Sequence, residues 1–220
     1  MNAPLRGHEH EFEPQYGLPE ELPQSEKLLW QGSPDWKSMA RHVFHLRKLV
    51  VYFAVIIAIR VVMVLGEGEG AMTAAISALW LTLLAGVAIG ILAMIAYFSA
   101  RTTVYSITSK RVVMRVGIVL TLTFNLPFKR IASADLREFN DGTGDIPLAL
   151  MDNDKIAYMH LWPHVRPWRM AQPQPMLRCL KNPQNVAAVL TRAWKDSVGP
   201  AALASHDQKH GVQTPTMSAA

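Results

Sequence analysis

Residues 70–100 read GAMTAAISALWLTLLAGVAIGILAMIAYFSA, and this segment contains no charged side chain. A bilayer core is crossed by about 20 consecutive apolar residues in a helix, so the segment is long enough to span even when it is tilted. We therefore predict a membrane-spanning helix here. The rest of the chain is interpreted outward from this helix.

A second apolar segment, residues 49–65, precedes it, and the sequence GEGEG (residues 66–70) separates the two. This linker is too short for a domain and predicts a tight turn, so residues 49–100 form a transmembrane helical hairpin. Arg60 is the one charged residue within either segment. We expect its side chain to extend along the helix toward the head groups or Glu67. The alternative is a contact between Arg60 and a helix of a partner protein.

The distribution of basic residues predicts the orientation of the hairpin. Lys and Arg flank the two apolar segments and are absent from the turn, which carries Glu67 and Glu69. Cytoplasmic loops are enriched in Lys and Arg, so both termini are predicted to be cytoplasmic. The basic residues used here are Lys37, Arg41, Arg47 and Lys48 before the hairpin, and Arg101, Lys110, Arg111 and Arg115 after it.

Composition divides the remainder into four parts. Residues 1–34 form an acidic, proline-rich cytoplasmic arm, and residues 35–48 are predicted to form an interfacial helix with apolar and basic sides. Residues 101–196 form a basic cytoplasmic domain, and residues 197–220 a disordered tail. The basic domain favours anionic lipid or an acidic protein face. No DNA- or RNA-binding motif accompanies these charges, so nucleic acid is not an expected partner.

Period-two alternation in the domain predicts antiparallel strands. They are expected near residues 103–107, 111–116, 121–126, 131–139, 147–151 and 155–162, with a turn at 140–145 and an irregular, proline-rich segment after residue 162. Asn182 suits a helix N-cap and Pro183 the first helical position. The helix that follows has one apolar stripe, formed by Val186, Val189, Leu190, Ala193 and Trp194. The expected fold is a mainly β barrel of about seven strands closed by this helix.

Four sequence motifs resemble bacterial membrane-attached pleckstrin-homology domains. YSITSKRVV (105–113) is similar to their opening hairpin, LPFKRI (126–131) to their third strand, and LKNPQNV (180–186) to their helix entry. EKLLWQGSP (26–34) resembles the segment that precedes their helical hairpin. The resemblance implies a pleckstrin-homology-like barrel attached to the transmembrane hairpin.

Shorter segments resemble the photosynthetic-complex assembly proteins of purple bacteria: FEP (12–14), GLP (17–19), WQGSPDW (30–36), HLRK (45–48) and YFA (52–54). This resemblance implies a non-enzymatic assembly factor, acting as a scaffold or chaperone in the inner (intracytoplasmic) membrane. The implied partners are subunits of the reaction centre, the core light-harvesting complex and membrane lipids. No cofactor is implied.

Two histidines leave a second class of function open. His42 and His45 lie three positions apart, a spacing that would place two ligands for a metal or a pigment on one helical face. A membrane-bound tetrapyrrole- or pigment-handling enzyme, or a lipid-binding protein, is therefore the alternative. No catalytic or metal site is predicted: Cys179 is expected to be a core residue, and the carboxylates of Asp141, Asp145, Asp152 and Asp154 are expected in solvated turns.

Two sets of residues are candidates for contacts with partners. Trp162, Arg166, Trp168 and Arg169 lie in the proline-rich segment, and interfaces are enriched in Trp and Arg. The alternative is that both tryptophan rings complete the core of the barrel. Gly86 and Gly90 form a Gly-x-x-x-Gly pair in the second apolar segment, a pattern that allows close helix packing, including packing in a homodimer.

Overall fold

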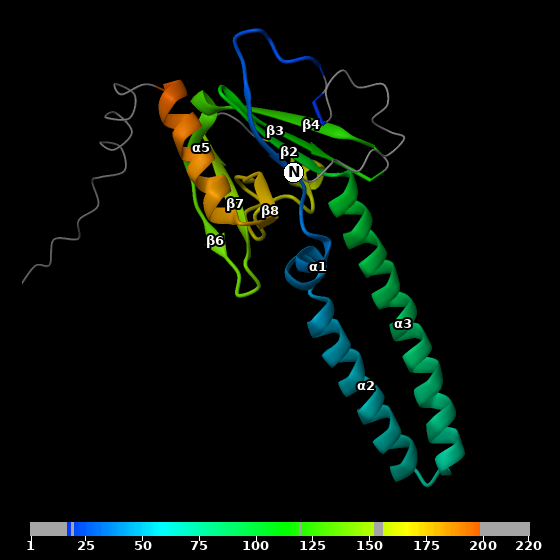
Figure 1. Cartoon of the computed structure of the whole chain (residues 1–220). Coiled ribbons are helices and arrows are strands. Elements are labelled where there is room, and N and C mark those ends of the chain that lie inside the picture. Colours follow the sequence, from blue (N-terminus) through cyan, green and yellow to red (C-terminus); the bar gives the residue numbers. More distant parts are fainter. Residues whose placement is uncertain (1–16, 19, 119, 152–155, 199–220) are drawn as a thin grey trace, which may run out of the picture.

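The computed structural model describes residues 17–18, 20–118, 120–151 and 156–198 (Figure 1). A helical hairpin projects from a domain built of two β-sheets and a C-terminal helix. Half of the predicted arm, nearly all of the predicted disordered tail, and Asp152 and Asp154 lie outside the described residues.

Both apolar segments are helical, as predicted. Helix α2 spans Leu46–Gly66 and helix α3 spans Ala71–Thr102, and both are long and apolar enough to cross a membrane. They run antiparallel and pack side by side (Figure 1). Ala74, Ala85 and Ala96 are the buried apolar positions along α3 before its last turn, and small residues let helices approach closely. Their spacing of 11 residues equals three helical turns, which keeps them on one face.

The predicted continuous interfacial helix at residues 35–48 is wrong. The segment is one short helix, α1 (Trp36–Ser38), followed by a π-helical turn, η2 (Met39–Val43). His45 then has a φ of 54° in the left-handed region, which separates η2 from α2. Tertiary packing explains the break, because Met39 and Ala40 are buried against Ala96 and Ala100 in a small core of their own.

The first sheet has the strand order β1-β2-β3-β4 and is antiparallel throughout. The first three strands predicted from the alternation in the sequence are confirmed as β2 (Val104–Thr108), β3 (Arg111–Val116) and β4 (Leu122–Pro127). Strand β1 (Leu28–Gly32) pairs with β2 and therefore belongs to the domain. The predicted boundary at residue 34 had assigned this strand to the arm. An ion pair of 2.9 Å between Glu26 Oε1 and Arg111 Nε joins the arm to β3.

The second sheet differs more from the sequence prediction. After the 3-10 turn η3 (Phe128–Arg130), β5 (Ile131–Ala134), β6 (Arg137–Glu138), β7 (Thr143–Leu150) and β8 (Met176–Lys181) follow. Their order is β5-β7-β6, and β8 also pairs with β7. Strand β7 begins inside the predicted turn at 140–145, and β8 was not predicted. The expected strand at 155–162 is wrong, since α4 (Tyr158–Leu161) is helical there.

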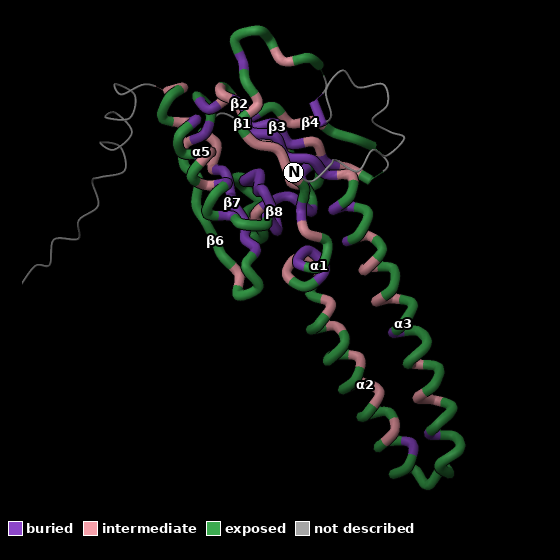
Figure 2. Tube along the Cα trace, viewed as in Figure 1, coloured by how far each residue is buried: buried purple, intermediate pink, exposed green. Residues whose placement is uncertain are grey.

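The two sheets do not form a closed barrel, which corrects the expected architecture. Within the described residues, no strand of the first sheet pairs with a strand of the second. Helix α5 (Pro183–Val198) begins at the predicted proline and packs its apolar stripe over the main core. That core lies between the sheets and α5 and includes Tyr105, Phe128, Leu148, Leu177 and Leu190. Figure 2 shows the contrast between this buried domain core and the largely exposed surface of the hairpin.

Candidate functional site

Residues 156–175, here called the crossing segment, run between β7 and β8 beside the base of the hairpin. His164 anchors this segment in the protein interior. Its Nδ1 lies 2.6 Å from the hydroxyl of Tyr105 in β2. Its Nε2 lies 3.3 Å from Ser99 Oγ in the last turn of α3 and 3.0 Å from Oγ1 of Thr103, the C-cap residue of that helix. The hairpin, the first sheet and the crossing segment therefore meet at one buried imidazole.

Both ring nitrogens of His164 lie within hydrogen-bond distance of hydroxyl groups. The Tyr105 hydroxyl at Nδ1 also accepts from the backbone N–H of Arg178 at 3.2 Å, and the Thr103 and Ser99 hydroxyls lie at Nε2. Burial, with the positive charge of Arg178, lowers the pKa of His164 to about 3, so the imidazole is neutral at physiological pH. Burial raises the pKa of Tyr105, which keeps its proton as well.

Arg178 connects three parts of the domain. Its Nη1 donates to the carbonyl of Pro163 at 3.0 Å, and its Nε lies 3.6 Å from Asp145 Oδ2 in β7. Asp145 Oδ1 also accepts from the backbone N–H of Cys179 at 2.8 Å. Burial, opposed in part by Arg178, raises the pKa of Asp145. Burial and the Asp145 charge raise the pKa of Cys179 to about 12, so Cys179 is a packed thiol, as predicted.

Asp141 and Asp145 were both expected in solvated turns, and the expectation is wrong for Asp145, which is buried in β7. Asp141 does follow β6 in a turn. Although burial disfavours its charge, hydrogen bonds from Thr143 and His42 lower its pKa to about 2. His42 Nε2 lies 3.0 Å from Asp141 Oδ2, and its ring stacks on Phe139 with centroids 4.0 Å apart.

His42 and His45 do not share a helical face. His42 belongs to η2 and contacts the β6–β7 turn, whereas His45 occupies the left-handed position before α2. Among the described residues, no three His, Cys, Asp or Glu side chains lie close enough together to hold a metal ion. The geometry therefore gives the pigment-ligand hypothesis no support from this pair.

The crossing segment also carries four large apolar side chains that are exposed. The exposed fractions are 90% for Trp168, 51% for Trp162, 78% for Met159 and 68% for Met170. The alternative in which both tryptophans complete the core is therefore wrong. Trp168 is also held at a φ of 66°, a left-handed conformation that is rare for a bulky residue.

The same segment is held firmly at its base. Val165 and Pro175 form an antiparallel bridge, and the N–H of Arg166 donates to the carbonyl of Gln174 at 2.9 Å. Arg166 Nη1 also reaches Asp135 Oδ2 at 3.2 Å. Arg166 thus holds the segment in place. Arg169, in contrast, is exposed, and no hydrogen bond or ion pair joins Arg169 to another described residue. The ring of Trp162 contacts Phe44 edge-on at 5.8 Å, next to the start of α2.

Gly86 and Gly90 both lie on an exposed face of α3, and a Cβ added to either would meet nothing within 4 Å. They therefore do not mediate the packing of α3 on α2, which uses the alanines instead. Arg60 is exposed on α2.

The sequence did not predict the buried cluster formed by Ser99, Thr103, Tyr105, His164 and Arg178, here called the junction network. Ser99, Thr103 and Tyr105 are close in sequence where α3 leads into β2, but His164 and Arg178 come from much later in the chain, so no local spacing signals the cluster. The available signal was a histidine within an apolar, proline-flanked run, LWPHVRP (161–167), a context that favours burial over exposure.

Comparisons with known proteins give two findings. A family model described as "Bacterial PH domain" matches residues 48–194. A Rhodobacter capsulatus protein named "Uncharacterized 23.7 kDa protein in puhA 5'region" is 36% identical over 190 residues, which cover 86% of this chain and 89% of that protein. No solved structure matches the chain.

Proposed function

Because the chain belongs to the bacterial PH domain family, we propose that it is a membrane-anchored scaffold of this family that assists the assembly of photosynthetic complexes. It performs no catalysis in this proposal. The hairpin keeps it among newly inserted membrane subunits, and the crossing segment binds a protein surface of the reaction centre or its core light-harvesting complex.

Anchoring in the membrane is supported by the surface of the hairpin. In both α2 and α3, only 6% of the most apolar 18-residue window is buried, and the mean hydropathy of these windows is 2.7 and 2.4. A core helix of a soluble protein with this composition would be covered by other elements. An apolar helix surface of this length that no other element covers fits the hydrocarbon core of a bilayer.

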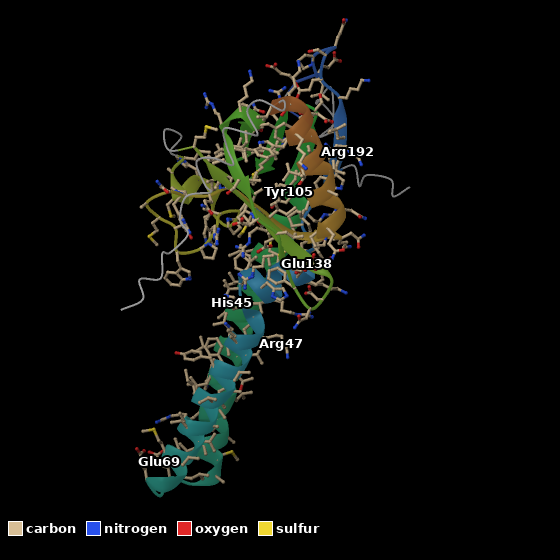
Figure 3. The ribbon with its side chains drawn as sticks, turned by 90° about the vertical axis from the view of Figure 1, so that its left-hand side faces the viewer. His45, Arg47, Glu69, Tyr105, Glu138 and Arg192 are labelled. Carbon is tan, nitrogen blue, oxygen red and sulfur yellow. The ribbon has the colours of Figure 1, made fainter. Side chains whose placement is uncertain are left out.

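Charge at the two ends of the hairpin supports a cytoplasmic domain in the inner (intracytoplasmic) membrane, with both termini on that side. Figure 3 shows Arg47 beside the domain and Glu69 at the far end of the hairpin. Basic residues favour the cytoplasmic side. Membrane-impermeant labelling of intact spheroplasts should reach a cysteine placed at Glu69, and not one placed at Arg192 in α5. Labelling only at position 192 would reverse the orientation.

The photosynthetic role is supported by the resemblance of the arm motifs and by the relative. The Rhodobacter capsulatus protein is named for its place in the 5' region of puhA.

The exposed crossing segment is the observation that carries the scaffold proposal. Within this one segment, Trp162, Trp168, Met159 and Met170 each expose a large apolar side chain, and Arg169 adds an exposed cation. Tryptophan and arginine account for much of the binding energy in protein interfaces. The open face of α3 around Gly86 and Gly90 offers a second surface, where a helix of a partner or of a second copy of the chain packs.

Deletion of the gene tests the proposal. The amount of assembled reaction centre should fall, while the complexes that do form keep a normal absorption spectrum, because a scaffold changes yield and not pigment chemistry. Unchanged yield in the deletion strain, measured under conditions that limit assembly, would contradict the proposal. An altered spectrum of the remaining complexes would favour pigment handling.

A further inference from the structure

A cluster of two cations and two aromatic rings lies on one side of the hairpin base. Trp36 in α1 and Tyr97 in α3 contact edge-on, with ring centroids 6.0 Å apart. Lys37 Nζ lies 5.9 Å from the Trp36 ring, and Arg101 Cζ lies 5.7 Å from the Tyr97 ring. These four residues are here called the collar.

The cations of the collar lack an anionic partner within the described part of the chain. No ion pair there involves Lys37 or Arg101, and the polar contact of Arg101 is a 3.0 Å hydrogen bond that its Nη1 donates to the Tyr97 hydroxyl. The nearby carboxylate of Asp35 is engaged elsewhere, because it accepts from Ser38 N and pairs with Lys181. No carboxylate of the described residues therefore compensates the positive charge of the collar at the surface.

The collar lies where the apolar surface of α3 ends. Arg101, Tyr97 and Met94 are spaced i, i−4 and i−7, so they share one helical face. Met94 is exposed on the apolar part of that face. Along one side of α3, the surface thus changes from hydrocarbon-like, through an amphipathic tyrosine, to a cation.

We propose that the collar binds the head group of an anionic phospholipid, taken from the leaflet next to the domain. The phosphodiester lies between Lys37 and Arg101, the rings of Trp36 and Tyr97 pack at the level of the glycerol backbone, and an acyl chain follows α3 past Met94. Tryptophan and tyrosine favour this level of a bilayer, and each nearby Lys or Arg strengthens binding to anionic lipid. This inference rests on the membrane anchoring proposed above.

Native mass spectrometry of the full-length protein in detergent tests the site, with phosphatidylglycerol as the probe and phosphatidylcholine as the neutral comparison. The double variant Lys37→Gln, Arg101→Gln should bind phosphatidylglycerol about tenfold more weakly than the unmodified protein. The matched control Arg192→Gln, Lys195→Gln removes two exposed cations from α5 and should bind it unchanged. Equal melting temperatures of the two variants establish that both are folded.

The competing outcomes are distinct. Equal phosphatidylglycerol binding by both variants would overturn the site, as would equal binding of phosphatidylcholine by the unmodified protein. Displacement of the lipid by inorganic phosphate would show a free-phosphate site and would overturn the lipid assignment. Extraction of the protein from membranes by alkaline carbonate would instead refute the anchoring. Failure of the photosynthetic role would appear only in the deletion strain and would leave lipid binding intact.

Discussion

His164 and Trp168 lie four residues apart in the crossing segment and meet opposite environments. His164 is buried and surrounded by hydrogen-bonding side chains, whereas Trp168 is the most exposed large apolar residue of the described chain. Residue type alone would suggest the reverse, since histidine is usually the more polar surface residue and tryptophan the more buried. The difference indicates that buried residues such as His164 hold the segment in place, whereas exposed residues such as Trp168 are available for contact with a partner.

Such a division separates stability from function. Changes in the junction network should unfold or loosen the domain, and changes to the exposed residues should leave folding intact and affect only binding.

Removal of the buried cation should have the largest effect. Arg178→Met leaves the Asp145 carboxylate buried without its charge partner and removes the hydrogen bond to Pro163. Breaking a buried pair in this way costs about 3–5 kcal/mol of unfolding free energy. The control Arg169→Met removes an exposed cation from the same region and should change stability by less than about 0.5 kcal/mol. Chemical denaturation that gives equal values for both variants would refute a stabilising role for the buried pair.

Acidification should destabilise the domain through His164. The pKa of His164 is about 3 in the folded state and about 6.5 in the unfolded state, so only the unfolded state gains a proton between these values. The stability contributed by the neutral ring is present above pH 6.5 and is lost as the pH falls toward 3. Between pH 7 and pH 4.5 the loss should be about 2–3 kcal/mol.

The variant His164→Gln serves as the reference for this pH dependence. Its unfolding free energy should fall less steeply than that of the unmodified protein between pH 7 and pH 4.5, because it lacks the group that titrates. Parallel pH profiles for the two proteins would mean that His164 titrates normally and is not buried as described.

Truncation of the exposed ring should affect binding and not folding. Trp168→Ala should leave the unfolding free energy within about 0.5 kcal/mol and weaken partner binding by about 2 kcal/mol, the scale of an interface hot spot. The readout is the amount of assembled reaction centre when the variant complements a deletion strain. Full complementation at limiting expression, with the variant present at normal levels in the membrane, would count against the proposed contact surface.

Substitutions on the open face of α3 should have the smallest effect on the stability of the isolated protein. Gly86→Leu and Gly90→Leu place side chains where nothing lies within 4 Å, so the unfolding free energy should change by less than about 0.5 kcal/mol. The matched change Ala85→Leu adds bulk to the buried face between the helices and should destabilise the hairpin by about 1–3 kcal/mol. Equal effects on both faces, measured by unfolding in detergent, would mean that the hairpin packs through the glycines.

Local sequence signals predicted the elements whose formation depends on local pattern. The absence of charge in residues 70–100 and the alternation across residues 104–127 each specify an element by composition or period. Asn182 and Pro183 correctly marked the start of α5, although Asn182 adopts a left-handed φ of 52°. These elements would be recognised in isolation.

The remaining elements depend on distant partners. Strand β8 follows a proline-rich stretch and leads directly into α5, so it has no turn signal of its own, and it forms because β7 is available to pair with it. Strand β1 is likewise formed by pairing with β2. The junction network joins positions 99, 103, 105, 164 and 178, and no single-sequence pattern brings these together. The candidate contact residues were predicted by type, but only the structure separates Arg166, which fixes the segment, from Trp168, which is presented.

Site-specific photocrosslinking tests most directly whether Trp168 contacts a subunit of a photosynthetic complex. A photoreactive phenylalanine analogue replaces Trp168 in one strain and the exposed Arg192 of α5 in another, and both are irradiated in cells that are assembling photosynthetic complexes. If Trp168 contacts a partner, position 168 should form a covalent adduct with a reaction-centre or core light-harvesting subunit, and position 192 should form none. Adducts from position 168 with lipid alone, or the same protein adducts from both positions, would contradict this contact.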